Sequence, residues 1–348
     1  MDLHVIETSM LPRAAHAYLM LLPDAPRFGA VFSEIQDESG PFDCAAAALN
    51  WLTHDYDTLR EALDSATHHR DDLAWQLAET LWPLFLHHRH LVSPTVFADG
   101  AAAAARTAHT TDDPEHTRRH RLGQTNLLLK EIAARMKLGD IDTAETLLPA
   151  ATALAGQLDS PMLQATAQAQ HGQLARAHGS LTEALDFLRA ALRLEEQGGT
   201  PRGASMRHRV LSLILRDLCL YDQAEIHLFL ARDLLAATGD AKDHAQISEP
   251  LGTLYSLTGR HDEAVTELTR ALTVFGELGS HYQATCHHQL ALALERRAAT
   301  TLHTDPPPDD TETNHDKTTQ DRHRAALHRS RARELTPAPS AAGTAPTT

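Results

Sequence analysis

The residues best suited to chemistry in this sequence are its histidines, of which there are 24 among 348 residues. His87, His88 and His90 form one dense group, and His287 and His288 form another. Adjacent residues on a helix point about 100° apart, whereas helical metal ligands use i, i+3 or i+4 spacing. His87 and His90 have that spacing, but no carboxylate or cysteine stands within a turn of them to complete a site. We interpret the groups as compositional bias and predict neither a metal nor another cofactor.

Other catalytic patterns are missing from the sequence as well. It holds no Gly-x-Ser-x-Gly elbow, no His-Glu-x-x-His, no glycine-rich dinucleotide loop and no Gly-x-x-x-x-Gly-Lys-Ser/Thr phosphate loop. Acidic residues instead gather at turns and helix starts, where their charge favours the helix dipole. We predict no catalytic residues and a protein that is not an enzyme; an enzyme using a histidine group is the least favoured alternative.

Charge and hydropathy exclude further classes of function. The formal net charge of −15 argues against direct nucleic-acid binding and against docking on an anionic membrane. No apolar run approaches the roughly 18 residues of a membrane span, and the N-terminus lacks a basic region followed by an apolar one. Cys44, Cys219 and Cys286 are interpreted as buried free thiols in a reducing cytoplasm, which is the expected location.

A helical pattern recurs every 40 residues along the middle of the chain. Ala264, Leu268 and Ala271 stand at i, i+4 and i+7, which places them on one face of a helix. Gly259 precedes that helix at a turn. The same pattern stands in three earlier copies, at Ala144, Leu148, Ala151; Ala184, Leu188, Ala191; and Ala224, Leu228, Ala231, with Gly139, Gly179 and Cys219 at the turns.

This pattern resembles the tetratricopeptide repeat (TPR), whose signature residues occur in the same order from Leu251 to Ala271. The period exceeds the usual length of about 34 residues, so longer helices or loops are expected. Gly252 should leave room for a neighbouring helix, and Gly259 should end the first helix in a left-handed conformation. The resemblance implies an all-α fold, a right-handed TPR-like superhelical solenoid of antiparallel helix pairs.

A second resemblance covers about residues 45–300. The runs at residues 48–52, 72–78 and 81–85 are similar to the start of the C-terminal TPR sensor region in bacterial STAND NTPase regulators of transcription, including those of antibiotic pathways. Asp55 and Thr58 stand where that family usually has Glu and Asn. The family's phosphate loop and a helix-turn-helix are missing from this sequence. The resemblance therefore implies only the sensor half, with a regulatory role linked to transcriptional control.

The expected organisation follows from these patterns and from the proline-rich stretches. We predict an irregular N-terminal arm at 1–43, with one helix around 13–21, and degenerate TPR-like helices at 44–123. The first of these helices should run from 44 to 69 with Asp43 as its N-cap, and the second should be kinked at Pro83. The TPR array should occupy 124–300. A disordered acidic, proline-rich insertion at 301–321, a capping helix at 322–336 and a disordered tail at 337–348 should follow.

The TPR resemblance also implies a binding groove, lined by residues at fixed positions of each first helix. Glu249 is the single anion at those positions, with Asp217 close by, so the groove should favour an acidic peptide or a protein with an acidic segment. Pairing of the arginines with neighbouring carboxylates is an equal alternative. A sensor of a small signalling molecule or peptide is the alternative function. The predicted groove residues are Lys137, Gln173, Arg176, Arg209, Arg216, Gln246, Gln289, Arg296 and Arg297, with Thr166 at a further such position.

Overall fold

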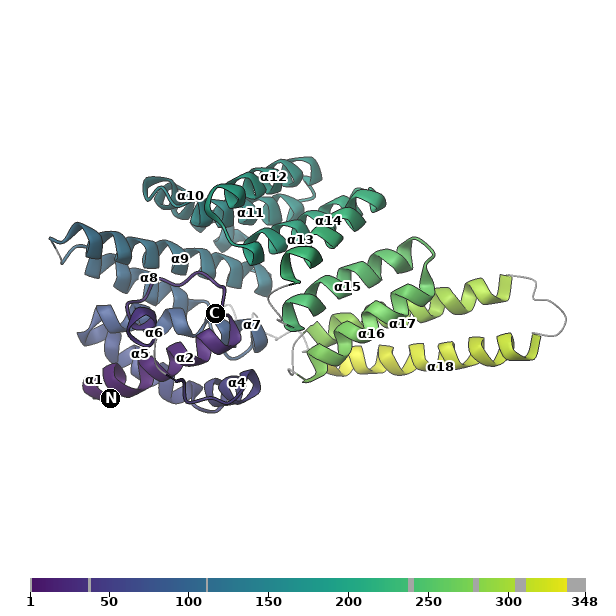
Figure 1. Ribbon diagram of the computed structural model, residues 1–348, viewed down its shortest axis with the longest axis horizontal. Helices are drawn as coiled ribbons and strands as arrows, with labels where there is room; N and C mark the ends of the chain where they lie inside the picture. Colours follow the sequence, from purple (N-terminus) through teal and green to yellow (C-terminus); the bar gives the residue numbers. More distant parts are fainter. Residues whose placement is uncertain are drawn as a thin grey trace, which may run out of the picture. The chain divides into compact units, whose positions relative to one another are not determined.

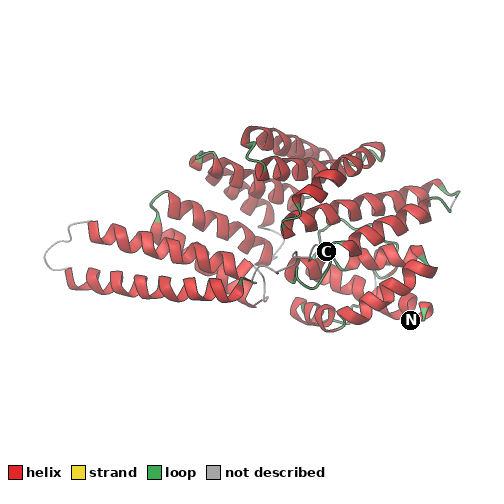
Figure 2. Cartoon of the chain, turned by 180° about the vertical axis from the view of Figure 1, so that it is seen from behind, coloured by secondary structure: helices red, strands yellow, loops and turns green. Residues whose placement is uncertain are grey.

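The computed structural model describes residues 2–36, 39–110, 112–236, 241–277, 282–303 and 311–336. Every regular element within these ranges is a helix, which confirms the predicted all-α class (Figures 1 and 2). The chain divides into two compact units, Met1–Leu220 and Tyr221–Thr348, here called unit one and unit two.

Unit one begins with short helices and continues with long ones. Its helices are α1 (Leu3–Val5), the π-helix η1 (Ile6–Met10), α2 (Leu11–Leu21), α3 (Val31–Glu34), α4 (Ala45–His54), α5 (Tyr56–His69), α6 (Asp71–Thr80), α7 (Trp82–His87), α8 (Thr95–Ala108), α9 (Pro114–Leu138), α10 (Ile141–Gln157), α11 (Pro161–Ala177), α12 (Leu181–Gly198) and α13 (Pro201–Asp217). Unit two contains α14 (Tyr221–Leu235), α15 (Ala241–Leu257), α16 (His261–Glu277), α17 (Tyr282–His303) and α18 (Thr311–Leu335).

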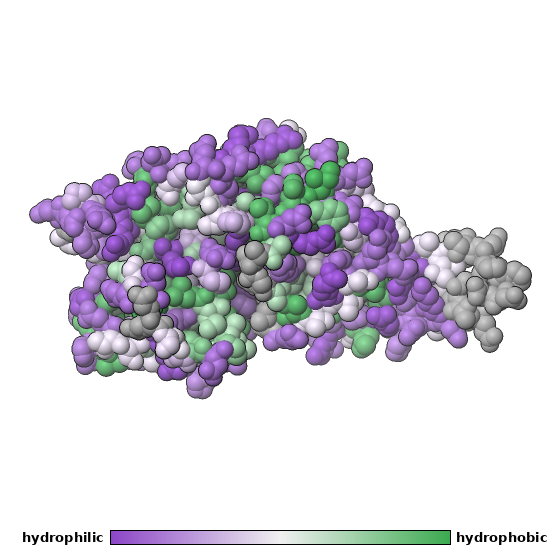
Figure 3. All heavy atoms as spheres, viewed as in Figure 1, coloured by the Kyte–Doolittle hydropathy of each residue, from purple (hydrophilic) through white to green (hydrophobic). Residues whose placement is uncertain are grey.

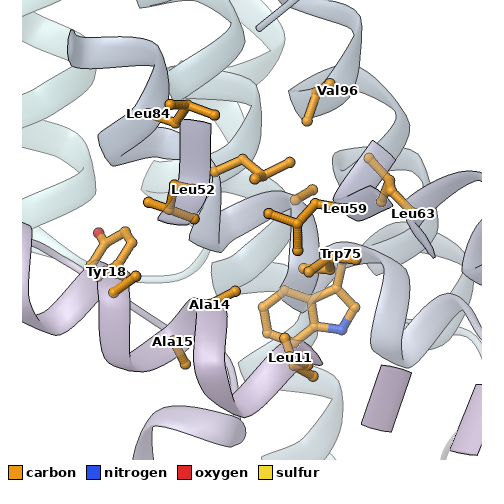
Figure 4. Packing of buried hydrophobic residues seen from close by; sticks show 14 of the residues in the cluster. Leu11, Ala14, Ala15, Tyr18, Leu52, Leu59, Leu63, Trp75, Leu84 and Val96 are labelled. Atoms are coloured by element: carbon orange, nitrogen blue, oxygen red, sulfur yellow. The ribbon is translucent and has the colours of Figure 1, made fainter. Parts of the chain in front are cut away.

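The first 43 residues differ from the irregular arm that we expected. They form α1 to α3, and α2 packs against α4 and α6. Ala14, Tyr18 and Leu21 recur at helical spacing and are buried, and Pro12 stands in the first turn of α2, where its missing N–H is not needed. Figure 4 shows Tyr18 and the α2 alanines among residues of the neighbouring helices. Burial of this apolar face makes the segment part of the core.

The next helices are more divided than predicted. The expected helix from 44 to 69 is two helices, which meet at Asp55, and its N-cap is Cys44 rather than Asp43. The expected disruption at Pro83 is confirmed, because α6 ends at Thr80 and α7 restarts with the proline in its first turn. The boundary predicted at 123/124 falls inside α9, and the two units divide inside the expected array.

The repeated stripe is confirmed as the buried face of each second helix. All twelve alanines and leucines of the pattern are at most 1% exposed, in α10, α12, α14 and α16. The turn glycines Gly139, Gly179 and Gly259 have φ angles of 86°, 81° and 83°. Cys219, which replaces glycine at the third turn, adopts the same left-handed region at φ 60°. Its thiol is exposed, as is that of Cys44, so the predicted burial of the cysteines holds for Cys286 alone among the three. The fold therefore imposes one turn geometry on every copy, even where the side chain opposes it.

Close helix contact explains two further glycines. A Cβ atom on Gly252 would lie 2.7 Å from Cγ of Leu268, and one on Gly172 would lie 3.0 Å from Cγ of Leu188. Both positions lie in first helices and face the leucine of the repeated pattern in the second helix. The predicted role of Gly252, to let the paired helix come close, is confirmed.

Side-chain bonds also follow the period of the repeat. Gln170 Nε2 donates to the carbonyl oxygen of Leu129 at 2.7 Å, across a separation of 41 residues. Arg207 Nη2 donates to Thr166 Oγ1 at 2.9 Å, also across 41 residues. Successive first helices therefore present equivalent positions to one another, and polar residues at these positions can form connected clusters.

The C-terminal helix differs from the prediction in its length. We expected a helix at 322–336 after a disordered segment at 301–321, but α17 continues to His303 and α18 starts at Thr311. Asp321, inside the expected disordered segment, is 2% exposed and pairs with Arg297 of α17. Partners on α17 order a sequence that is too polar to fold alone. Residues 304–310 and the tail at 337–348 lie outside the described ranges.

Helices within the described ranges do not combine the length and hydropathy that a bilayer crossing requires. Polar side chains cover much of the face seen in Figure 3, with apolar patches between them.

Candidate functional site

The nine predicted groove residues lie on the first helices of the helix pairs, and all are half-buried. Unit one carries five of them, on α9, α11 and α13, and unit two carries four, on α15 and α17. The unit-one residues are Lys137, Gln173, Arg176, Arg209 and Arg216; the unit-two residues are Gln246, Gln289, Arg296 and Arg297.

Three of the unit-one residues share one hollow. Lys137, Gln173 and Arg176 line a depression of about 360 Å³, here called the basic hollow. Asp217 lies at its edge, with Met136, Ile141 and Ala177 completing the wall. The structure thus brings residues from α9, α11 and the end of α13 into one place.

Asp217 holds two arginines of this region in fixed orientations. Arg176 donates to Oδ2 through Nη2 and Nε at 2.6 and 2.7 Å. Arg216 donates to Oδ1 through Nη2 and Nε at 2.8 and 3.1 Å. Asp217 thus pairs with two arginines, and Lys137 lines the same hollow, so these four residues carry a summed formal charge of +2. Pairing of the arginines with neighbouring carboxylates, which the sequence left as an equal alternative, is observed for Arg176 and Arg216. The summed formal charge of the four residues is nevertheless positive.

Arg209 is not one of the residues that line the basic hollow. Its Nε is buried without a hydrogen-bond partner in the described part of the chain. Burial lowers the pKa of the neighbouring Arg207, and the charge of Arg209 lowers it further, while Glu195 opposes both. Arg209 therefore belongs beside a second, more buried group of charges.

In unit two, the predicted groove residues do not form one site. Arg296 donates to Ser256 Oγ at 2.8 Å, which links α17 to α15. Gln246 and Gln289 are half-buried on the same two helices. Arg297 forms two hydrogen bonds with Asp321 of α18, at 2.6 and 2.8 Å, and a third with Asp262 at 2.8 Å. It serves the packing of unit two, because adjacent residues point to different faces of a helix.

A second cavity of unit one holds functional candidates that the sequence reasoning missed. It measures about 170 Å³ and lies among α9, α11, α12, α13 and the segment that follows α2. Lys130, Gln170, Glu195 and Arg207 line it, and we call it the polar cavity. Glu195 Oε1 lies 3.4 Å from Arg207 Nε, and burial raises the pKa of Glu195. Burial also lowers the pKa of Lys130 to about 8, against the opposing effect of Glu79.

The N-terminal segment forms one wall of the polar cavity with Tyr18, Asp24, Ala25 and Pro26, and Glu79 of α6 binds the residues that follow. This fully buried carboxylate accepts hydrogen bonds from the backbone N–H groups of Phe28 and Gly29, and from Asn126 Nδ2 at 2.7 Å. Lys130 Nζ lies 3.8 Å from Glu79 and 5.3 Å from the ring centre of Tyr18. The N-terminal residues that we expected in an irregular arm therefore form part of the cavity wall.

One sequence signal could have indicated this cavity. Glu195 stands 40 residues after Ala155, 40 residues before Leu235 and 80 residues before Phe275. Those three apolar residues are fully buried at the same position of their second helices. A carboxylate at a core position of the repeat indicates a local polar requirement.

The histidines give no metal site in the described residues. Groups of three or more histidine, cysteine, aspartate or glutamate side chains that could hold an ion do not occur there. His287 Nδ1 instead lies 2.8 Å from His328 Nδ1 in unit two, and the rings of His88 and His90 meet edge to face.

Comparisons with known proteins bear on the fold. No protein-family model matches the chain. A catechol 1,2-dioxygenase from Pseudomonas sp. (strain EST1001) is 33% identical over 88 residues, which are 25% of this chain and 29% of that enzyme. The chain thus spans less than a third of the length of this curated relative.

Solved structures match over more of the chain. The human IFIT1 dimer with m7Gppp-AAAA has a TM-score of 0.52 at 15% identity, over 94% of this chain and 66% of that one. A monomeric IFIT1 mutant with the same capped RNA reaches 0.53 at 15% identity, over 94% and 67%. BtubC from P. vanneervenii is 18% identical, with a TM-score of 0.48, over 72% of this chain and 98% of that chain. Together with the repeat geometry, the two IFIT1 matches confirm the TPR-like helical fold.

Proposed function

We propose that this chain is a non-enzymatic binding module that holds an acidic segment of a partner protein at the basic hollow of unit one. The observation that carries the proposal is the excess of positive charge around Asp217, on a chain whose formal net charge is −15. A local charge of opposite sign to the whole molecule selects an anionic partner and orients it.

The geometry suits a carboxylate-bearing peptide. Asp217 engages the Nε and one terminal nitrogen of both Arg176 and Arg216, which fixes the guanidinium planes and lowers the entropy cost of binding. Gln173 adds a side-chain amide to the same hollow. An acidic segment can therefore meet charge and amide groups that are already held in place.

A regulatory role is a further part of the proposal. It is supported by the resemblance of residues 45–300 to the sensor region of bacterial transcriptional regulators. We place the protein in the cytoplasm on the same ground, with a protein or peptide as its partner and neither nucleic acid nor membrane as a direct one.

A labelled deca-glutamate peptide tests the proposal, with an uncharged Gly/Ser peptide and a deca-lysine peptide beside it. We expect the acidic peptide to bind, and its affinity to fall as salt is raised. The Arg176→Ala and Lys137→Ala variants should each weaken binding about five- to tenfold.

Arg189→Ala is the matched control, because Arg189 is an exposed arginine of unit one on the second helix α12. Equal binding of the acidic peptide to the wild type, to the control and to both hollow variants would rule out the basic hollow as its site. Stronger binding of the deca-lysine peptide would contradict the sign of the charge.

A further inference from the structure

Four residues that line the polar cavity each carry a buried polar atom that has no hydrogen-bond partner in the described part of the chain. These atoms are Lys130 Nζ, Gln170 Oε1, Glu195 Oε2 and Arg207 Nε. An unpaired buried polar atom costs about 1–3 kcal/mol, and such atoms are rare in folded proteins. Two of them have a carboxylate nearby without a hydrogen bond: Lys130 Nζ lies 3.8 Å from Glu79 Oε1, and Arg207 Nε lies 3.4 Å from Glu195 Oε1. The charges are therefore compensated, but the hydrogen-bonding capacity around the cavity is not filled, which favours an occupant that pairs with these atoms.

The four atoms include both donors and acceptors. Lys130 and Arg207 can only donate hydrogen bonds, whereas the free oxygens of Gln170 and of ionised Glu195 can only accept them. An occupant that satisfies both sets must itself carry an acceptor and a donor. A simple anion would leave the Gln170 and Glu195 oxygens unpaired.

The charges of the cavity favour an occupant with no net charge. Three cations, Lys130, Arg202 and Arg207, and two carboxylates, Asp24 and Glu195, line it. Glu79 adds a third carboxylate beside Lys130, so three positive charges face three negative ones. An anion would unbalance this set, but a zwitterion would not.

The remaining wall and the volume limit the rest of the occupant. Trp82, Met162 and Met206 provide apolar surface. Methionine side chains adapt to apolar groups of varied shape. The volume of about 170 Å³ is close to the roughly 150 Å³ of a cavity that holds benzene, so the occupant is small.

We propose that the polar cavity binds a small zwitterion, namely an α-amino acid with an apolar side chain. Its carboxylate accepts hydrogen bonds from Lys130 and Arg207. Its ammonium donates to Gln170 Oε1 and Glu195, and its side chain contacts Met162 and Met206. The site is separate from the basic hollow, because the two share no lining residue.

The test uses the full chain and the proteinogenic L-amino acids, added one at a time at millimolar concentration, with thermal unfolding and calorimetry as readouts. We expect apolar amino acids to raise the unfolding temperature, and leucine serves as the reference. Its two matched analogues are 4-methylpentanoate, which lacks the ammonium, and 3-methylbutylamine, which lacks the carboxylate. Both should bind at least about tenfold more weakly than leucine.

Variants locate the site. Lys130→Met and Gln170→Met keep side-chain length but remove the pairing groups, and each should weaken leucine binding about tenfold or more. Arg189→Met, a similar change on the exposed face of α12, should leave it unchanged. If one cavity variant does not fold, the other still decides the question.

Three results would overturn the proposal. The first is that no amino acid binds the wild type, which would leave a cavity filled by water only. The second is equal binding of leucine and either analogue, and the third is unchanged binding to the cavity variant that folds. Failure of acidic-peptide binding at the basic hollow would leave this proposal intact.

Discussion

Arg297 and Asp321 form the most buried arginine–carboxylate pair of unit two. The side chains are 13% and 2% exposed, and two parallel hydrogen bonds of 2.6 and 2.8 Å join them. The pair connects α17 to α18 across a stretch of residues that the structure does not describe.

Removal of the arginine should therefore destabilise unit two. Arg297→Ala leaves the Asp321 carboxylate buried without its cation, and we expect a loss of about 3 kcal/mol in the free energy of unfolding. Urea unfolding measures it. Arg331→Ala, at an exposed ion pair on α18, should change that energy by less than about 0.5 kcal/mol. Equal effects of the two substitutions would show that the buried pair does not stabilise the helix packing.

Gly252 should not tolerate a side chain. In Gly252→Ala the new methyl group meets Leu268 Cγ at 2.7 Å and the Ala264 carbonyl oxygen at 3.1 Å, so the helices must separate. We expect a loss of about 1–3 kcal/mol in thermal unfolding. Gly276→Ala is the control in the same unit, because its methyl group would meet no atom within 4 Å. It should be neutral or mildly stabilising, and a loss of similar size there would contradict the close-packing explanation.

Replacement of Cys219 by glycine should stabilise the folded chain. Its φ of 60° costs a residue with a Cβ atom about 1 kcal/mol, which glycine avoids. Cys219→Gly should raise the free energy of unfolding by roughly that amount. Gly179→Ala, at φ 81° in the equivalent turn, should lower it by a similar amount. The pair of variants is measured by urea unfolding, and a change of the same sign in both would refute the turn argument.

Lys130 should make the stability depend on pH. Burial lowers its pKa from 10.5 to about 8, so between these values the unfolded chain binds more protons than the folded one. The free energy of unfolding contributed by Lys130 therefore rises from pH 8 to pH 10.5, by on the order of 3 kcal/mol.

Comparison with Lys130→Met isolates this contribution. Tyr18 lies beside Lys130, and burial raises its pKa, which lowers stability above pH 10 in both proteins. The unfolding free energy of the variant minus that of the wild type should be highest below pH 8 and fall by on the order of 3 kcal/mol towards pH 10.5. Loss of the cation beside Glu79 shifts this difference at every pH and leaves its slope unchanged. A difference that stays constant across this range would contradict the lowered pKa of Lys130.

The fold could be predicted from the sequence to the extent that it repeats. Ala144, Leu148 and Ala151 and their copies identified the buried faces, and Gly139, Gly179 and Gly259 identified the left-handed turns. A local period is enough for this, because each repeat packs mainly on its neighbours. The segment at residues 1–43 has no such period, so its packing on α4 and α6 could not be read locally.

The candidate sites were predicted less well. Lys137, Gln173 and Arg176 meet in one hollow, as the shared repeat positions implied, whereas Arg297 turns to α18. The polar cavity was missed because Glu79, Lys130 and Glu195 come from three distant segments. Their burial depends on how those segments close on one another, and no spacing within a single helix expresses it.

The sequence by itself determined the helix pairs, their buried stripes and their turns, because these follow from side-chain spacing along one helix. Only the tertiary structure decided which charges remain on a surface and which become buried without partners. That outcome depends on contacts between residues far apart in the sequence, such as Phe28 and Glu79, which are 51 positions apart, and on the water those contacts exclude.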